Sequence, residues 1–509
     1  MEKIEARSVV KHIRSATLEG ATAQAVTIEA SFTRGLPSFS IVGLGDEAIK
    51  EAKERVKSAL LLSGFQFPPL KITVNLFPSD LKKSGSQMDL PMALLIALQK
   101  EVVEFGTFFC FGELGLDGTV RSTPVIFALA LSLAKEGKLH KVVCDRASAT
   151  ELARIPGVQA YGVETLSEAI GFFRGEILRP VEPEPISAQI LQLDQPYYYE
   201  PISGDDFSEV RGQALAKRAA AIAAAGFHNL ALIGAPGCGK SMIVKRLGSI
   251  LPPMSLAELL ERASLDSLEG RRPGFKARRP HRGPHHTATR ASIFGGGSSK
   301  AARMGEVALA NGGILFFDEL PHFPKSILEA LREPLEDHRL LISRVNTKVV
   351  YETRFLFAAA MNPCPCGHLF SQTRECRCTP LEIARYQNRL SEPFWDRIDL
   401  VVQMADSDIS QKGDVDSKSL RDQVFEAFRM QKTRGQERLN GKLDDAETER
   451  FCKLEREEED LLIQAANRFG FSQRSAGKIK RVARTIADLQ GAERIEKTHL
   501  LEALSFRRR

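Results

Sequence analysis

The sequence predicts an α/β protein with more than one domain. The chain has 509 residues, more than a single hydrophobic core usually contains. Strand-like and helix-like stretches alternate through residues 1–175 and again from about 203 to 405, which is typical of α/β folds. The last hundred residues are expected to be helical, because no proline follows Pro393 and apolar residues recur at helical spacing through Val482 and Ile486.

The N-terminal stretch contains elements with recognisable ends. Pro37–Val42 and Lys71–Phe77 are expected strands. Between them Asp46–Ser63 is an expected helix, with its first residue as the N-cap and Gly64 as the stop. An apolar helix is expected near Leu90–Leu98.

Prolines indicate a break in this pattern. Ile177–Pro201 contains five prolines and shows no clear hydrophobic period, which is typical of an interdomain linker. We therefore predict four parts: an N-terminal α/β domain over residues 1–176, a linker over 177–202, an α/β core over 203–405 and a C-terminal helical domain over 406–509.

Composition excludes several classes of protein. Apolar residues make up 43% of the chain and charged residues 26%, which argues against general disorder. The N-terminus lacks the apolar core of a signal peptide, and the longest apolar runs are about half a membrane span. We therefore expect a cytoplasmic protein that does not bind a membrane. The net charge of +6 is too small to indicate nucleic acid by itself.

A phosphate-binding loop is the most specific motif in the chain. Asn229–Ser241 consists of an apolar strand, a glycine-rich turn and a helix start, and it fits the pattern G-x-x-x-x-G-K-[ST]. Backbone N–H groups of such a loop surround phosphates, and the helix dipole adds to the attraction. We expect Lys240 to reach the β and γ phosphates of ATP, and Ser241 to hold Mg²⁺. The predicted nucleotide contacts in this segment are Gly234, Pro236, Gly237, Cys238, Gly239, Lys240, Ser241 and Met242.

Two further strands are expected to bring polar residues to the same edge of the sheet. The apolar run Gly313–Phe317 is followed by Asp318 and Glu319. This pattern is typical of a buried parallel strand, whose last residues place acidic side chains at the carboxyl edge of the sheet. We expect Asp318 to join the Mg²⁺ shell and Glu319 to position and deprotonate the attacking water. Arg354–Met361 runs into Asn362, whose amide can orient that water or touch the γ-phosphate.

Several longer stretches resemble known families. Residues 203–505 resemble the magnesium-chelatase-like branch of the AAA+ ATPases, in which a P-loop core is followed by a helical lid. Motifs from both halves of the chain resemble the ComM/YifB family. The stretches that support the resemblance are Asp206–Gln213, the phosphate-binding segment Asn229–Ser241, Gly295–Ser298, Gly305–Gly313, Phe317–Pro321, Leu331–Asp337, Met361–Gly367 and Arg481–Leu489.

The resemblance implies a function and several residue roles. It implies a ring-forming ATPase, expected to be a homo-hexamer, with Asn362 as sensor 1, Arg397 as a trans-acting arginine finger and Arg474 as sensor 2. Val210 and Gln213 are expected near the adenine. Family members are associated with DNA uptake and act as helicases that drive branch migration during recombination. The partners implied are single-stranded or branched DNA, together with recombination or DNA-uptake proteins.

Other functions remain open at this stage. A magnesium-chelatase-like ATPase that inserts a metal ion would have the same ATPase core. A non-enzymatic zinc-bearing DNA scaffold conflicts with the intact set of hydrolytic residues. An ATP-dependent protease needs a nucleophile.

The N-terminal domain resembles the Lon-protease-like fold of the ribosomal S5 type, as in Phe111–Arg121. Proteolysis in that family requires a serine four residues after a lysine. Counting from Lys83, that position holds Gln87, and Ser86 is one residue away. Because an amide cannot attack a peptide carbonyl as an activated hydroxyl does, we interpret the domain as a non-proteolytic scaffold or DNA platform.

Four of the eight cysteines are close together in the sequence. Cys364 and Cys366 form one C-x-C pair, and Cys376 and Cys378 form another. Four thiolates match the tetrahedral ligand set of a structural Zn²⁺ site, although the usual spacing is C-x₂₋₄-C and His368 could replace one thiolate. An Fe–S cluster and free or disulfide-bonded cysteines are the alternatives.

Positive charge is concentrated between the two phosphate-binding motifs. Gly270–Arg303 contains nine basic residues and no acid, so the rest of the chain is mildly acidic. We predict a DNA-contacting insertion that tracks phosphates without reading bases. The alternatives are a solvated flexible loop and contacts with the nucleotide phosphates. The candidate DNA contacts are Arg278, Arg279 and Arg282.

A β-hairpin is the second candidate for DNA contact. Alternating apolar residues in Arg339–Tyr351 flank Asn346 and Thr347, which are suited to a turn. Arg344 and Lys348 would lie beside its tip. An ordinary exposed hairpin is an equal alternative.

Overall fold

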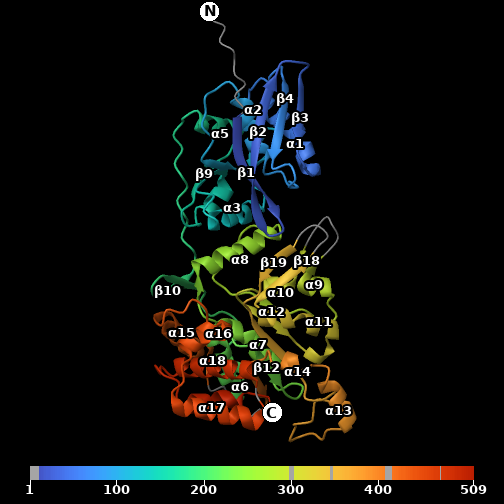
Figure 1. Ribbon diagram of the computed structural model, residues 1–509, viewed down its shortest axis with the longest axis vertical. Coiled ribbons are helices and arrows are strands. Elements are labelled where there is room, and N and C mark those ends of the chain that lie inside the picture. The colour runs from blue at the N-terminus through green and yellow to red at the C-terminus, as the bar shows by residue number, and fades with distance from the viewer. Residues whose placement is uncertain (1–10, 297–302, 344–347, 407–414, 471, 509) are drawn as a thin grey trace, which may run out of the picture. The chain divides into compact units, whose positions relative to one another are not determined.

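The computed structural model describes residues 11–296, 303–343, 348–406, 415–470 and 472–508 (Figure 1). The chain forms two compact units. Unit 1 comprises Met1–Ser187, Leu259–Phe275 and Arg344–Val349, and unit 2 comprises Ala188–Glu258, Lys276–Ser343 and Val350–Arg509. Both contain sheets and helices, so the predicted α/β class is confirmed. No helix in the described part of the chain combines the length and apolar character that a membrane span requires.

Unit 1 contains a seven-stranded mixed sheet with the strand order β3-β4-β2-β1-β5-β8-β9. β1 and β2 form an antiparallel hairpin, whereas β5, β8 and β9 pair in parallel. The short strands β6 and β7 pair with each other. The strands are β1 (Lys11–Glu19), β2 (Thr22–Thr33), β3 (Ser38–Val42), β4 (Lys71–Phe77), β5 (Phe108–Cys110), β6 (Glu113–Leu114), β7 (Val120–Arg121), β8 (Lys141–Asp145) and β9 (Gln159–Val163).

The two helices that the sequence predicts in unit 1 are both present. The Asp46 carboxylate accepts the N–H of Ile49 at 3.1 Å and caps α1 (Glu47–Leu62). Gly64, at φ +81°, follows its end. The apolar helix α2 (Asp89–Ala97) packs against β1 and β2. The remaining helices are α3 (Ile126–Lys135), α4 (Arg146–Leu152) and α5 (Leu166–Phe173).

The first part of the basic segment, which we define as Gly270–Arg303, belongs to unit 1 up to Phe275. Leu259–Phe275, which includes most of α8 (Leu256–Leu268), lies in this unit. The Phe275 ring meets Phe127 edge-on, with centroids 5.5 Å apart. Arg272 Nε donates to Glu151 Oε1 at 2.7 Å. Arg272 is therefore neutralised by a carboxylate of its own unit.

Unit 2 contains a five-stranded parallel sheet with the order β14-β17-β20-β12-β21. Its central strands are buried and apolar, as parallel strands covered on both faces must be. The strands are β12 (Leu230–Ile233), β14 (His281–Arg282), β17 (Ile314–Phe317), β20 (Leu356–Met361) and β21 (Leu400–Gln403).

Shorter elements surround this sheet. The segment predicted as a linker contains β10 (Gln189–Gln192) and β11 (Pro196–Tyr199), which form a three-stranded sheet with β13 (Met254–Ser255). β18 (Arg339–Ser343) and β19 (Lys348–Glu352) form a two-stranded sheet, as do β15 (Gly295–Gly296) and β16 (Arg303–Met304). The helices between the strands are α6 (Ala214–Gly226), α7 (Lys240–Leu247), α9 (Arg290–Phe294), α10 (Glu306–Leu309), α11 (Lys325–Ala330), α12 (Arg332–Glu336), α13 (Pro380–Gln387) and α14 (Glu392–Trp395).

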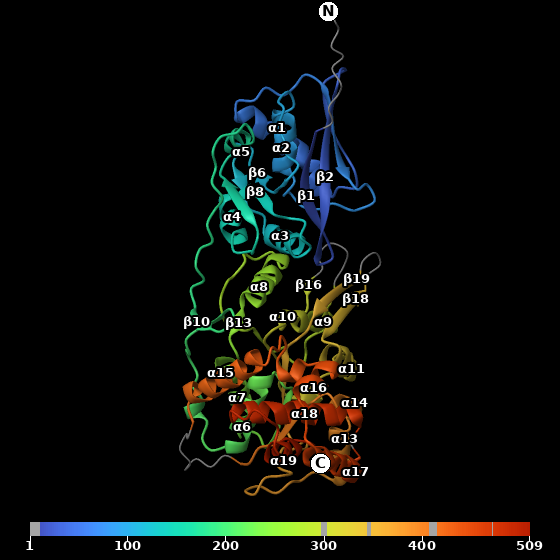
Figure 2. The same ribbon diagram turned by 60° about the vertical axis from the view of Figure 1, so that its left-hand side comes forward.

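The C-terminal part of unit 2 is helical, as predicted. α15 and α18 both pack against α6 (Figure 1 and Figure 2). A buried ion pair anchors α18 to the start of β21, because Lys478 Nζ lies 3.3 Å from Asp399 Oδ1. Burial acts to raise the pKa of Asp399, but the nearby positive charges outweigh it and hold that pKa well below its usual range. The helices are α15 (Ser417–Thr433), α16 (Asp445–Phe451), α17 (Arg456–Phe469), α18 (Gln473–Leu489) and α19 (Lys497–Ser505).

Arg279 is a buried structural residue of unit 2, although it lies in the basic segment. Only 7% of it is exposed. Its guanidinium donates to Glu258 Oε1 at 2.7 Å and to the carbonyls of Pro252, Pro253 and Gly312 at 2.7–2.8 Å. These bonds join the residues before α8, the basic segment and the residues before β17. The side chain is therefore not in a position to contact DNA phosphates.

We expect Arg279→Ala to lower the free energy of unfolding by about 3–5 kcal/mol, because it leaves the Glu258 carboxylate and three carbonyls without their donor. Urea denaturation followed by circular dichroism measures this change. Arg278→Ala is the matched control, since the neighbouring side chain is exposed and its loss should change stability by less than about 0.5 kcal/mol. Equal effects of the two substitutions would contradict the structural role.

Candidate functional site

The loop between β12 and α7 has the conformation of a phosphate-binding loop. Gly237 and Gly239 have φ values of +82° and +95°, which side chains with a Cβ rarely adopt. Lys240 Nζ donates to the carbonyls of Gly234 and Ala235 at 2.7 and 2.8 Å. The ammonium group is thus held over the loop, where it can bind phosphate oxygens.

Asp318 lies next to this loop, as predicted. The Ser241 hydroxyl donates to Asp318 Oδ2 at 2.7 Å. A hydroxyl and a carboxylate in contact at the start of a helix are the oxygen ligands that Mg²⁺ takes beside a bound triphosphate. The donor set therefore fits Mg²⁺, with Ser241 and Asp318 as its protein ligands.

Asn362 completes the arrangement from the next strand. It follows β20 directly, and its Oδ1 accepts a hydrogen bond from Lys240 Nζ at 3.2 Å. The parallel sheet therefore brings Lys240, Asp318 and Asn362 together from three separate segments. The role of Asn362 toward the γ-phosphate stays a prediction.

Glu319 is exposed and follows Asp318 at the same sheet edge. Its φ of +52° is unusual for a residue with a side chain and costs on the order of 1–2 kcal/mol. His286 Nδ1 lies 3.6 Å from Glu319 Oε2, and the His285 ring lies beside that of His286 at 4.1 Å. Sequence reasoning did not foresee this contact, because His286 lies 33 residues earlier in the chain.

Gln213 contacts the phosphate-binding loop from the segment before α6. Its Nε2 donates to the carbonyls of Cys238 and Ala405 at 3.4 and 2.8 Å. Val210, three residues earlier, is buried in the hydrophobic core. The geometry places Gln213 beside the loop, and adenine contacts of Val210 and Gln213 remain predictions.

Arg397 and Arg474 meet at one carboxylate. Both guanidinium groups form ion pairs with Glu336, at the end of α12. Arg397 is buried, whereas Arg474 is exposed at the start of α18. Burial lowers the pKa of both arginines. No sequence pattern indicates this shared partner, which lies 61 residues before Arg397.

The four cysteines converge as predicted. Their Sγ atoms all lie within 4.8 Å of one another, and Cys364 is 3.4 Å from Cys366 and 3.7 Å from Cys376. A tetrahedral site with Zn–S bonds of about 2.3 Å has sulfur atoms about 3.8 Å apart. The donor set therefore fits a metal ion of this kind. The cluster in the described residues consists of cysteines alone, without His368.

The cysteine loop also contacts the phosphate-binding loop. A Cβ at Gly367 would lie 2.5 Å from Cδ of Pro236, so only glycine allows this close approach. Gly367 also has a φ of +83°. The loop between Cys366 and His368 therefore packs directly on the residue before Gly237.

The predicted DNA contacts have different surroundings. Arg278 is exposed, and no carboxylate of the described residues lies within ion-pair distance of it. Arg282 lies 3.8 Å from Glu306. Arg344 lies outside the described residues, and Lys348 is the first residue of β19.

Among the described residues of unit 1, Lys83 and Ser86 each have a partner other than one another. Lys83 is fully buried, and its Nζ donates to the carbonyl of Pro78. The Ser86 hydroxyl is bonded to Glu113 instead. Gln87 is buried and donates to the carbonyls of Ala16 and Ser84 at 3.2 and 2.9 Å. The Lon-like fold and the non-proteolytic role of the domain both stay predictions.

Comparison with protein families defines the class. The family described as magnesium chelatase, subunit ChlI, matches residues 206–412, and its C-terminal family matches residues 414–507. A third, described as subunit ChlI of Mg-chelatase, matches residues 28–147. Together with the phosphate-binding site, these matches indicate an AAA+ ATPase of the magnesium-chelatase type, which implies ATP and Mg²⁺.

Similar proteins narrow the class further. Competence protein ComM of Haemophilus influenzae is 38% identical over 96% of this chain and 95% of its own length. Uncharacterized proteins YifB of Salmonella typhimurium and Escherichia coli are 37% and 38% identical over 98% of this chain and 96% of theirs. The chain belongs to the ComM/YifB family.

We expect Lys240→Ala to abolish tight nucleotide binding, because it removes the charge that the loop holds toward the phosphates. Titration with a fluorescent ATP analogue measures the affinity, which should fall by about 100-fold or more for a lost charge-assisted contact. Lys325→Ala is the control, since Lys325 is an exposed lysine on α11. An unchanged affinity of the Lys240→Ala variant would contradict the assignment.

Proposed function

We propose that the protein is an ATP-driven DNA motor, a helicase that promotes branch migration in homologous recombination and natural transformation. The main support is the complete hydrolytic site in a chain that is similar to a competence protein over nearly its whole length. An ATPase of this kind acts as a homo-hexameric ring on single-stranded or branched DNA.

Each residue of the site has its own role in ATP hydrolysis. Lys240 and the loop N–H groups bind the phosphates, and Asn362 orients the reacting group. Ser241 and Asp318 hold Mg²⁺, which supplies charge neutralisation when it is bound. Glu319 accepts the proton of the attacking water. His286, 3.6 Å from the Glu319 carboxylate, helps to orient that base.

The pair of arginines at Glu336 supports a role between subunits. Both interact with Glu336, and among the described residues neither lies within ion-pair distance of Asp318 or Glu319. We propose that Arg397 exchanges Glu336 for the phosphates of a neighbour's nucleotide, and that Arg474, as sensor 2 in the helical lid, exchanges it for the nucleotide that the lid covers. An anion of higher charge can displace the carboxylate, because guanidinium binds phosphate strongly.

The structure changes which basic residues are proposed to contact DNA. Arg279 is excluded, because its guanidinium is buried and fully bonded. Arg278 is exposed without a carboxylate partner among the described residues, so it is the stronger candidate. Arg282 would have to give up its contact with Glu306.

DNA should stimulate ATP hydrolysis by the wild-type protein, because a motor hydrolyses faster when it engages its track. Steady-state ATPase rates measured with single-stranded, duplex and four-way-junction DNA test this. Glu319→Gln should lower kcat by about 10²–10⁴-fold while leaving nucleotide binding intact, as loss of a general base does. Absence of stimulation by every DNA would contradict the motor, and stimulation by a metal-binding porphyrin partner instead would favour metal insertion.

We also propose that Cys364, Cys366, Cys376 and Cys378 hold a structural Zn²⁺ ion. Their sulfur separations suit Zn–S bonds, and a closed set of four thiolates leaves no position for catalysis. Zinc there would stiffen the loop that packs on Pro236.

Purified protein should contain one zinc ion per chain, measured by atomic emission spectrometry. Cys366→Ser should lower the zinc content sharply, because removing one of four thiolates opens the site. His368→Ala should leave the zinc content unchanged, since His368 is outside the sulfur cluster. Iron with acid-labile sulfide in place of zinc would overturn the proposal.

A further inference from the structure

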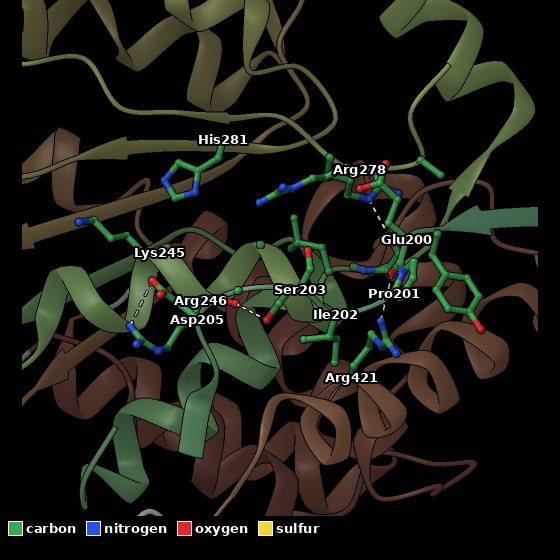
Figure 3. A pocket seen from close by; sticks show the side chains of 18 of the residues that line it. Glu200, Pro201, Ile202, Ser203, Asp205, Lys245, Arg246, Arg278, His281 and Arg421 are labelled. Atoms are coloured by element: carbon green, nitrogen blue, oxygen red, sulfur yellow. Dashed lines mark hydrogen bonds and ion pairs between the residues drawn. The ribbon is translucent and has the colours of Figure 1, made fainter. Parts of the chain in front are cut away.

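Unit 2 contains a cavity of about 300 Å³ that does not belong to the nucleotide site (Figure 3). Lys245, in the last turn of α7, lines it together with Arg278 and His281. None of its lining residues comes from Gly234–Ser241. Lys245 is five residues beyond Lys240, hence about 7–8 Å further along the helix and on a different face.

Three nitrogen-bearing side chains gather at one end of this cavity. In the view of Figure 3, His281 lies between Lys245 and Arg278. Burial lowers the pKa of His281, and the positive charges of Arg278 and Lys245 lower it further. In the described part of the chain, no carboxylate lies within ion-pair distance of Lys245 or Arg278. Like charges with no counter-ion are costly to hold together, so this arrangement favours an anion.

The other arginines around the cavity already have partners. Arg246 pairs with Glu209 and lies 3.8 Å from Asp205. Arg421 donates to the backbone carbonyl of Glu200 at 3.2 Å. These residues form walls of the cavity, and Glu200 and Asp205 are the carboxylates that line it. The unpaired charge is therefore confined to the end with Lys245, Arg278 and His281.

The shape and lining of the cavity indicate the class of ligand. Two permanent positive charges and an imidazole match a phosphate, which has up to two negative charges and several acceptor oxygens. Ile202, Tyr199 and Phe425 add apolar and aromatic surface to the lining. A volume of about 300 Å³ is at the lower end of the range for small-ligand pockets.

We propose that this cavity binds a phosphate group through Lys245, Arg278 and His281, at a site separate from the ATPase centre. The phosphate belongs either to a free phosphorylated molecule of about mononucleotide size or to the backbone of DNA. Both sources present the same chemistry to the three side chains, and the site does not depend on the protein being a DNA motor.

Site-resolved acetylation of the full-length protein tests the proposal. Lysines are acetylated with a water-soluble N-hydroxysuccinimide ester, and the rate at Lys245 is measured by mass spectrometry with inorganic pyrophosphate, with a single-stranded oligonucleotide, or with neither. Lys276 and Lys325, which are exposed and do not line the cavity, are the internal controls. We expect several-fold slower acetylation of Lys245 with at least one probe, unchanged rates at the controls, and loss of the protection in Arg278→Ala.

The pattern of protection identifies the source of the phosphate. Protection by pyrophosphate supports a site for a small phosphorylated ligand, and protection by the oligonucleotide alone supports a DNA phosphate. Equal protection of Lys245 and the control lysines, no protection at Lys245, or protection that survives Arg278→Ala would overturn the proposal. Urea denaturation of Arg278→Ala, followed by circular dichroism and compared with the wild type, shows whether the variant is folded, so a lost site can be told apart from a damaged fold.

Discussion

The parallel register of β12, β17 and β20 is the constraint on which the ATPase site depends. Ile233 lies opposite Met361, and Phe317 lies opposite Ala359. The residue after each strand therefore reaches the same edge, and the contacts of Lys240 with Asn362 and of Ser241 with Asp318 follow from it. A shift of one strand by one residue would turn its side chains to the opposite face and separate these groups. The buried apolar core of the strands fixes the register and so fixes the chemistry.

Sequence patterns predicted those parts of the molecule that depend on neighbours along the chain. The Asp46 cap, the strand Lys71–Phe77 and the phosphate-binding loop each depend on a few adjacent residues, and each was found as expected. Contacts between distant segments could not be predicted in this way. Nothing in its spacing distinguishes Arg279, a buried structural residue, from the exposed Arg278 beside it. Proline content likewise hid the pairing of β11 with β13, because a strand tolerates proline as its first residue, which is the position of Pro196.

The basic segment is better understood as several separate structural environments than as one charged loop. Arg272 pairs within unit 1, and Arg279 joins three segments of unit 2. Arg278 alone of these three is exposed beside a cavity. The number of charged residues in a stretch of sequence gives only its net charge. Whether one of these arginines can bind a ligand depends on the carboxylates that lie next to it in the folded protein. The protein thus uses some of its excess arginine to build the fold.

The two ion pairs at Glu336 make Arg397 and Arg474 dependent on each other. Two guanidinium groups that share one carboxylate repel one another, so each weakens the ion pair that the other forms with Glu336. When one of them leaves, the remaining pair tightens, so removal of the second requires more free energy than removal of the first. The departure of these arginines from one chain is therefore anticooperative. The two guanidinium groups therefore leave Glu336 one after the other. Between the state with both arginines on Glu336 and the state with neither lies an intermediate in which one arginine is still paired with it.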